Sequence, residues 1–399
     1  MLSERLLKAL MIAGSIVIAV CFVCILLLSR ALSMEKDKQS AGMVQDQTTP
    51  VALPSATLNL LPKSGETSSE PVLTFAVFGG SADKSGNGKR LHEPALRNAL
   101  SSIKEGEGAQ FAVVLGDLAS GSVSAEHAAA NLNAWLDVAT DYFPEGFFYP
   151  CFGLQESAHK GRSKIFAEHD DRTHPDNADK VEQNYKIAVF SEVFDEFEVT
   201  GFCHSVYGRT AYYFRRENCN FIVLNTKWYE QMDRVSKTVR DWIAGIAKNG
   251  ADFNLIFLYG TPFPTFSVGM EMDAPYSTTT DDFAGKSNKE FRDEFWSLVE
   301  GLPGAIVFCG SEQLYARKTI DARYGNFQKY VFQISSAGLQ GAFDTGINDP
   351  NSLDAGPYYR EHYIIGKIHA DRMVFEVKTV EDSAMLDSFV MVAQREDAG

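Results

Sequence analysis

The stretch Val307-Phe308-Cys309-Gly310-Ser311-Glu312-Gln313-Leu314-Tyr315-Ala316-Arg317 joins an apolar run to a glycine-containing turn. A short apolar run bounded by such a turn is consistent with a buried strand. In open α/β sheets, ligands gather at the carboxyl ends of the strands. The turn at residues 310–313 is therefore a place where functional side chains are expected.

The same pattern recurs along the chain, and amphipathic segments separate the apolar runs. Helices are expected around residues 93–103 and 125–136. Buried strands are expected at residues 73–78, 111–115, 147–151, 221–224, 255–258, 306–309 and 330–334. An antiparallel meander is expected at residues 363–368, 373–378 and 385–392. This alternation predicts an α/β fold, with central mixed sheets flanked by helices.

Length, composition and charge limit the class of protein. The chain has 399 residues, of which 45% are hydrophobic, so one sizeable domain with a large core is expected. Its 37 basic and 52 acidic residues leave a formal net charge of -15. That charge disfavours non-specific attraction to nucleic acid or to anionic lipid headgroups. No nucleic-acid partner is expected.

Residues 9–29 contain no charged side chain and are long enough to cross a bilayer core of roughly 30 Å as a helix. We expect this segment to be an uncleaved transmembrane signal anchor that follows a short N-terminal segment at residues 1–8. The alternative is a cleaved signal peptide with its cleavage site at Ser29-Arg30-Ala31.

Residues 30–71 are rich in Ser, Thr, Gln, Pro and charge, which predicts a flexible tether. The main domain is expected at residues 72–395. Because a short N-terminus precedes a large domain, the expected protein is single-pass, with this domain outside the cytoplasm. The membrane is thus an expected partner, through residues 9–29.

The glycine-containing turns resemble, in order, the motifs of the calcineurin-like metallophosphoesterases, especially the purple acid phosphatase-like branch. The resemblance covers residues 72–393. The strand pair at residues 211–214 and 220–226 and the closing strand at residues 385–389 are also similar to the family's. The resemblance implies a four-layer metallophosphoesterase fold. In active members it also implies two divalent metals (Fe, Mn or Zn), which clamp the attacking and leaving oxygens.

The first three turns keep one of the family's metal ligands. In the first turn, Gly80 and Ala82 stand where the family has the aspartate and histidine of Gly-Asp-x-His. In the second turn, Asp117 keeps the residue that bridges both metals. In the third turn, Leu154 and Gln155 replace the asparagine and histidine of Gly-Asn-His-Glu.

The last two turns keep none of the ligands. Gly260 replaces the histidine of His-x-Pro, and Ser311 and Gln313 replace both histidines of Gly-His-x-His. These three places and the five of the first three turns make eight, which we call the vestigial positions. Because only Asp117 survives, no bound metal, no cofactor and no catalytic residue are expected.

The leading hypothesis is therefore a membrane-tethered pseudo-phosphoesterase, a binding or structural module with an unknown protein partner. On this reading Asp117 has a structural role, because aspartate often accepts backbone N–H bonds at helix starts. One alternative is an active phosphoesterase with a rebuilt metal site. A residual cation site of Asp117, Glu156 and Glu312 is the candidate for it, since hard cations take oxygen ligands. Another alternative is a structural subunit of an envelope assembly.

The histidines and cysteines offer no substitute active site. None of the eight histidines falls on a ligand position of the resemblance. The cluster from His169 to His174 lies in a polar insertion, where a solvated loop is expected. Cys203 and Cys219 flank a hairpin-like region, so a disulfide between them in an oxidising compartment is a further alternative.

Overall fold

A computed structural model describes residues 70–83, 89–121, 124–144, 146–157, 185–226, 234–265, 288–336, 338–339 and 353–392. All of these lie in one unit, Leu60–Gly399. Within these ranges, no helix is long and apolar enough to cross a membrane. The expected membrane span at residues 9–29 and the histidine cluster at residues 169–174 lie outside the described residues.

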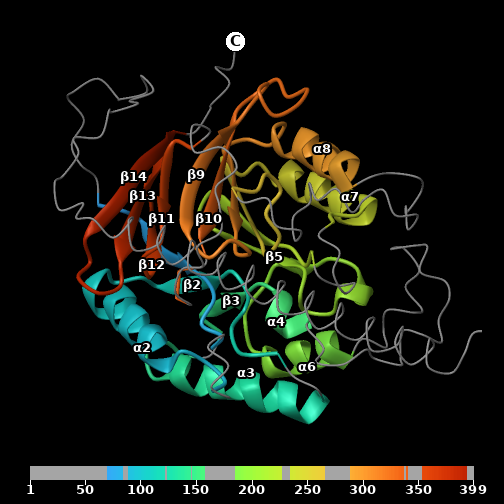
Figure 1. The fold of residues 1–399 in the computed structure, drawn as a ribbon. Helices are drawn as coiled ribbons and strands as arrows, with labels where there is room; N and C mark the ends of the chain where they lie inside the picture. Colours follow the sequence, from blue (N-terminus) through green and yellow to red (C-terminus); the bar gives the residue numbers. More distant parts are fainter. Residues whose placement is uncertain are drawn as a thin grey trace, which may run out of the picture. The chain divides into compact units, whose positions relative to one another are not determined.

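One sheet has six strands in the order β14-β13-β12-β1-β2-β3 (Figure 1). They are β1 (Leu73–Phe78), β2 (Phe111–Val114), β3 (Phe148–Pro150), β12 (His362–Ile368), β13 (Arg372–Thr379) and β14 (Met385–Val392). β1, β2 and β3 are parallel to one another. β12 pairs antiparallel with β1, so the C-terminal meander extends the same sheet.

The other sheet has eight strands in the order β11-β9-β10-β8-β7-β6-β5-β4. They are β4 (Gly201–Phe202), β5 (Tyr212–Arg216), β6 (Cys219–Val223), β7 (Phe253–Leu258), β8 (Ala305–Cys309), β9 (Tyr315–Ile320), β10 (Val331–Ser336) and β11 (Ala355–Tyr358). β6, β7, β8 and β10 are parallel, and the strands at either end pair antiparallel. Both sheets are therefore mixed.

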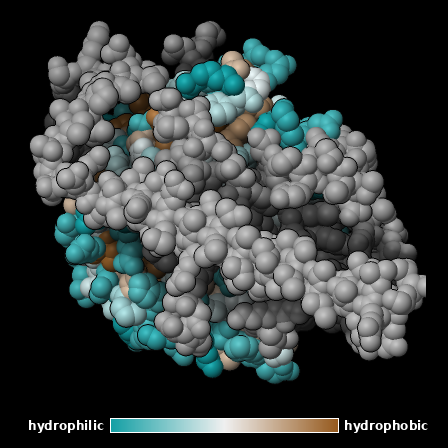
Figure 2. All heavy atoms as spheres, in the orientation of Figure 1, coloured by the Kyte–Doolittle hydropathy of each residue, from teal (hydrophilic) through white to brown (hydrophobic). Residues whose placement is uncertain are grey.

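Helices cover the outer faces of the two sheets. They are α2 (Glu93–Ser101), continued by a π-helix (Ser102–Gly106), α3 (Ala125–Thr140), α4 (Leu154–Ser157), α6 (Tyr185–Val193), α7 (Lys237–Ile246) and α8 (Asn288–Val299). In Figure 1, α2 and α3 lie on one side and α7 and α8 on the other, which makes four layers. Figure 2 shows a mainly hydrophilic surface over α2 and α3.

Two of these helices begin at a serine that caps them. The Ser124 hydroxyl accepts from the His127 N–H at 3.2 Å, and α3 follows. The Ser236 hydroxyl accepts from the Val239 N–H at 3.3 Å, and α7 follows. Each cap satisfies one of the backbone donors that a helix N-terminus leaves free.

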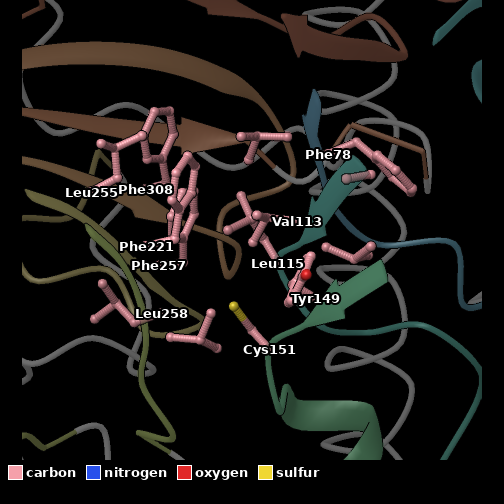
Figure 3. Packing of buried hydrophobic residues seen from close by; sticks show 14 of the residues in the cluster. Phe78, Val113, Leu115, Tyr149, Cys151, Phe221, Leu255, Phe257, Leu258 and Phe308 are labelled. Carbon is pink, nitrogen blue, oxygen red and sulfur yellow. The ribbon is translucent and has the colours of Figure 1, made fainter. Parts of the chain in front are cut away.

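The main core lies between the two sheets and is rich in phenylalanine. Phe75 of the six-stranded sheet meets Phe221 of the eight-stranded sheet edge-on, with ring centroids 5.0 Å apart. Phe257 and Phe308 stack at 5.1 Å on neighbouring strands. Figure 3 shows Phe221, Phe257 and Phe308 gathered on one side and Val113 facing them. Such aromatic contacts add directional packing to the burial of apolar area.

The sequence predicted most of this fold. The predicted strands are all present within three residues at each end, but β4, β9 and β11 were missed. The Cys203–Cys219 disulfide, which the sequence left open as an alternative, is not formed, since both thiols are free. Cys203 lies level with Ala211, whose carbonyl accepts its N–H, whereas Cys219 pairs with Arg216. Five residues along a strand separate these levels, roughly 17 Å.

Candidate functional site

The vestigial positions meet at one edge, where the parallel strands of both sheets end. The N–H of Gly80, after β1, donates to Gly116 O at 3.1 Å, and the Ala82 N–H donates to Asp117 O at 2.9 Å. The two sheets touch here as well, because a Cβ added to Gly310 would lie 2.0 Å from Leu115 O. We call this edge, with its turns, the site edge.

Turns from the eight-stranded sheet complete the site edge. The Ser311 N–H donates to Tyr259 O at 2.8 Å, and the Ser311 and Thr261 hydroxyls are 2.7 Å apart. The Gly260 N–H donates to the Thr226 hydroxyl at 3.2 Å. Residues that stand for metal ligands in the resemblance are thus held by hydrogen bonds between protein groups.

Asp117 is buried, and both of its carboxylate oxygens accept hydrogen bonds from the protein. Oδ1 accepts from the Gln155 N–H at 2.8 Å, in the first turn of α4. Oδ2 accepts from the Tyr259 hydroxyl at 3.0 Å. The backbone of Asp117 is left-handed, with φ 54°, a conformation that aspartate tolerates better than most residues. The one surviving ligand therefore acts as an acceptor that ties two turns together.

Tyr259 fills the space between the turns of the two sheets. A Cβ added to Gly116 or to Gly153 would lie 3.0 or 2.9 Å from its Cδ2 atom, so the ring packs against both glycine backbones. Only 1% of Tyr259 is exposed. No motif of the resemblance singled out Tyr259. Its sequence signal is its place between the expected buried strand at residues 255–258 and Gly260.

Glu156 is the second buried carboxylate of the site edge. Its oxygens accept from three backbone N–H groups, those of Asp117 (2.8 Å), Leu118 (2.7 Å) and Gly153 (2.9 Å). Burial raises the pKa of Glu156 above its usual range, and the charge of Asp117 raises it further, while the three N–H groups oppose the shift. Glu156 thus locks the second turn to the third.

The side chains of the remaining candidates bond to other groups. The Gln155 Oε1 atom accepts from the Gly121 N–H at 2.9 Å. The Glu312 carboxylate accepts from the Thr265 N–H and from the Ser335 hydroxyl. Within the described ranges, no three His, Cys, Asp or Glu side chains are placed to hold one metal ion. The alternative cation site of Asp117, Glu156 and Glu312 therefore gains no support from these residues.

One buried histidine lies at the start of β12 and was not singled out by the sequence. His362 Nε2 is 3.0 Å from the Ser336 hydroxyl, and Nδ1 is 2.8 Å from Arg360 O. Burial lowers the pKa of His362 to about 4, so its imidazole is neutral near pH 7. A base this weak fits a structural role better than proton transfer at neutral pH.

Comparison with solved structures identifies the fold. The purple acid phosphatase PPD1 from yellow lupin (Lupinus luteus) is 11% identical, with a TM-score of 0.54 over 81% of this chain and 54% of the lupin protein. PhoD is 12% identical, with a TM-score of 0.53 over 82% of this chain and 70% of PhoD. The chain has the calcineurin-like metallophosphoesterase fold. It spans about half the length of the lupin phosphatase. No protein-family model and no curated protein matches the sequence.

The residues of this metallophosphoesterase fold do not fit a two-metal centre. Such a centre needs several converging oxygen and nitrogen ligands, whose orientation is fixed by surrounding hydrogen bonds. The vestigial positions supply one carboxylate, and both of its oxygens already accept from protein donors. No catalytic step through metals is therefore assigned to this chain.

Proposed function

We propose that the chain is a membrane-tethered pseudo-phosphoesterase, which displays this fold outside the cytoplasm as a binding or structural module and does not hydrolyse phosphate esters. The observation that carries the proposal is the position of Tyr259. Its ring packs on Gly116 and Gly153, and its hydroxyl donates to Asp117. The carboxylate that the resemblance assigns to metal bridging is thereby bound to protein.

The lost ligands support the same reading. In this fold's chemistry, metals generate the nucleophile and neutralise the charge of the phosphate. Glycine, alanine, serine and leucine at five of the vestigial positions supply no charge, and only the serine hydroxyl could coordinate. Ser311 shares a hydrogen bond with Thr261 instead. The function that remains for the domain is to bind a partner, which the uncharged span at residues 9–29 would hold near a membrane.

An assay of ester hydrolysis tests the catalytic half of the proposal. The full chain in detergent is supplied with manganese, zinc or iron and with phosphomonoester and phosphodiester substrates. We expect no metal-dependent turnover above background, and we expect Asp117→Asn to leave that background unchanged. Robust metal-dependent hydrolysis that disappears in Asp117→Asn would instead support the active enzyme with a rebuilt site.

Fractionation tests the membrane half. We expect the full chain to stay with the membrane pellet after alkaline carbonate extraction, because an apolar helix of this length is not released by charge changes. The N-terminus of the mature protein is determined on the same material. A mature protein that begins at Leu32 would show that the segment is a cleaved signal peptide.

A further inference from the structure

The parallel strands of both sheets run in the same direction, which defines two opposite edges. The Leu339 N–H, after β10, donates to Gly79 O, after β1, so both strands end at the site edge. β12 runs antiparallel to β1, and each later strand of the meander reverses again. The opposite edge therefore carries the starts of β1, β2, β3 and β10 and the end of β14. We call it the tether edge.

The chain enters the domain at the tether edge. The Val72 N–H donates to Ile368 O at 2.8 Å, and β1 begins at the next residue. The register pairs Leu73 with Ile368, and Ile368 with Met373. Arg372, the residue before Met373, pairs with Val392, so the end of β14 lies at nearly the same level as the start of β1. The chain is thus described from Glu70 at this edge, and not from the site edge.

Exposed hydrophobic side chains are concentrated on the tether edge. Among the described residues, eight large hydrophobic side chains are exposed. Five of them are at or near the tether edge, namely Val72, Phe147, Tyr330, Val390 and Val392. The three others, Phe202, Tyr359 and Met385, lie at strand ends on the site edge. Five of the eight make the tether edge the more apolar of the two edges.

These side chains are spread widely, which favours a broad, flat partner. Phe147 precedes β3, and Val390 and Val392 lie in β14, at opposite sides of the six-stranded sheet. Five interstrand spacings separate these strands, roughly 24 Å. A protein pocket would need the apolar residues in one cluster, whereas a bilayer surface can accept them singly across this width.

We propose that the tether edge docks on the lipid surface, with these five side chains in the boundary between headgroups and acyl chains. The inference rests on the proposed membrane anchor. Valine and phenylalanine suit the upper acyl region, and a tyrosine such as Tyr330 suits the aromatic belt at the interface. Arg372 and Asp371, which lie at the same edge, form an ion pair at 3.1 Å, so their charges are balanced.

The tether makes weak apolar contacts sufficient for docking. The net charge of -15 gives no attraction to anionic headgroups, so the domain needs another means of staying close. A flexible chain as long as residues 30–71 has a root-mean-square span of about 35–40 Å, which holds a domain at a millimolar effective concentration. In this docked state the site edge, with Tyr259 and Asp117, faces away from the membrane.

Depth-dependent fluorescence quenching tests the orientation with the full chain in phosphatidylcholine liposomes. A reporter thiol is introduced as Val392→Cys and carries a fluorophore that lipids brominated near the top of their acyl chains can quench. Phe202→Cys is the matched control, because both side chains are 38% exposed and they lie at opposite edges. Cys21, Cys24 and Cys203 are changed to serine so that the fluorophore reacts only with the introduced thiol. Cys151, Cys219 and Cys309 are kept because they are buried.

We expect the brominated lipids to quench the Val392→Cys label and to leave the Phe202→Cys label unchanged. A label at Tyr330→Cys should be quenched as well. The brominated lipids could instead quench the Val392→Cys and Phe202→Cys labels equally, in protein that carbonate does not release from the liposomes. That result would overturn the docking and leave the anchor in place. Energy transfer between Val392→Cys labels on two chains, without quenching, would also overturn it, because a second copy would then cover the edge. Release by carbonate would overturn anchor and docking together.

Discussion

Removing one hydroxyl from Tyr259 should destabilise the domain measurably. In Tyr259→Phe the ring still packs on Gly116 and Gly153, but the hydrogen bond of 3.0 Å to Asp117 is lost. Hydrogen bonds to charged groups contribute about 1.5–3 kcal/mol, and the buried Oδ2 atom of Asp117 also loses the compensation for its desolvation that the tyrosine hydroxyl gives. We therefore expect the free energy of unfolding to fall by about 2 kcal/mol.

A second buried tyrosine supplies the control. The Tyr212 hydroxyl donates to the neutral carbonyl of Pro150, also at 3.0 Å, and Tyr212 is fully buried. Tyr212→Phe should cost only about 1 kcal/mol, since hydrogen bonds between neutral groups contribute less. Urea unfolding of the full chain in detergent at pH 7, followed by tryptophan fluorescence, compares the two. An equal or smaller cost for Tyr259→Phe would refute the idea that Tyr259 stabilises the charge of Asp117.

Two further predictions concern the same edge. Gly310→Ala should lower the stability of the domain by more than the usual 1–3 kcal/mol of overpacking, because its Cβ would meet Leu115 O at 2.0 Å. Its control is Gly245→Ala, inside α7, where nothing lies within 4 Å of the added Cβ, so stability should rise by up to about 1 kcal/mol. Thermal unfolding measures both changes. The pKa of His362 is about 4 in the folded protein, against an ordinary value of 6.5. The unfolded chain therefore takes up this proton more readily, and the free energy of unfolding should fall by about 3 kcal/mol as the pH is lowered from 6.5 to 4. Urea midpoints across this range should fall less in His362→Gln, and an unchanged pH dependence in that variant would exclude His362 as the cause.

Much of the fold could be predicted because its strands are apolar. Strands such as β7 and β8 are buried along their whole length, so they read as continuous apolar runs. β9 was missed because it contains Arg317 and Lys318, which look like surface residues. In the structure Lys318 is buried and donates to the carbonyls of Phe263 and Pro264. That pairing depends on a distant loop, which local sequence cannot reveal.

The sequence predicted that the turns meet at one edge, but it did not predict the contacts that hold them together. Motif order located the turns, since the carboxyl ends of parallel strands meet at one edge. The lost ligands could be counted from the sequence alone. The roles of Tyr259 and Glu156 could not be predicted, because each depends on groups that lie far away in the chain. Tyr259 bonds a residue 142 positions away, and Glu156 accepts from residues up to 39 positions away.

The metal content of the purified full chain tests the central claim most directly. The protein is prepared without chelators, equilibrated with manganese, zinc and iron, separated from free metal and measured by elemental analysis, beside Asp117→Asn. Because one carboxylate already bound by protein donors cannot hold two divalent ions, we predict no stoichiometric metal in either protein. Two ions per chain, lost in Asp117→Asn, would contradict the pseudo-phosphoesterase account.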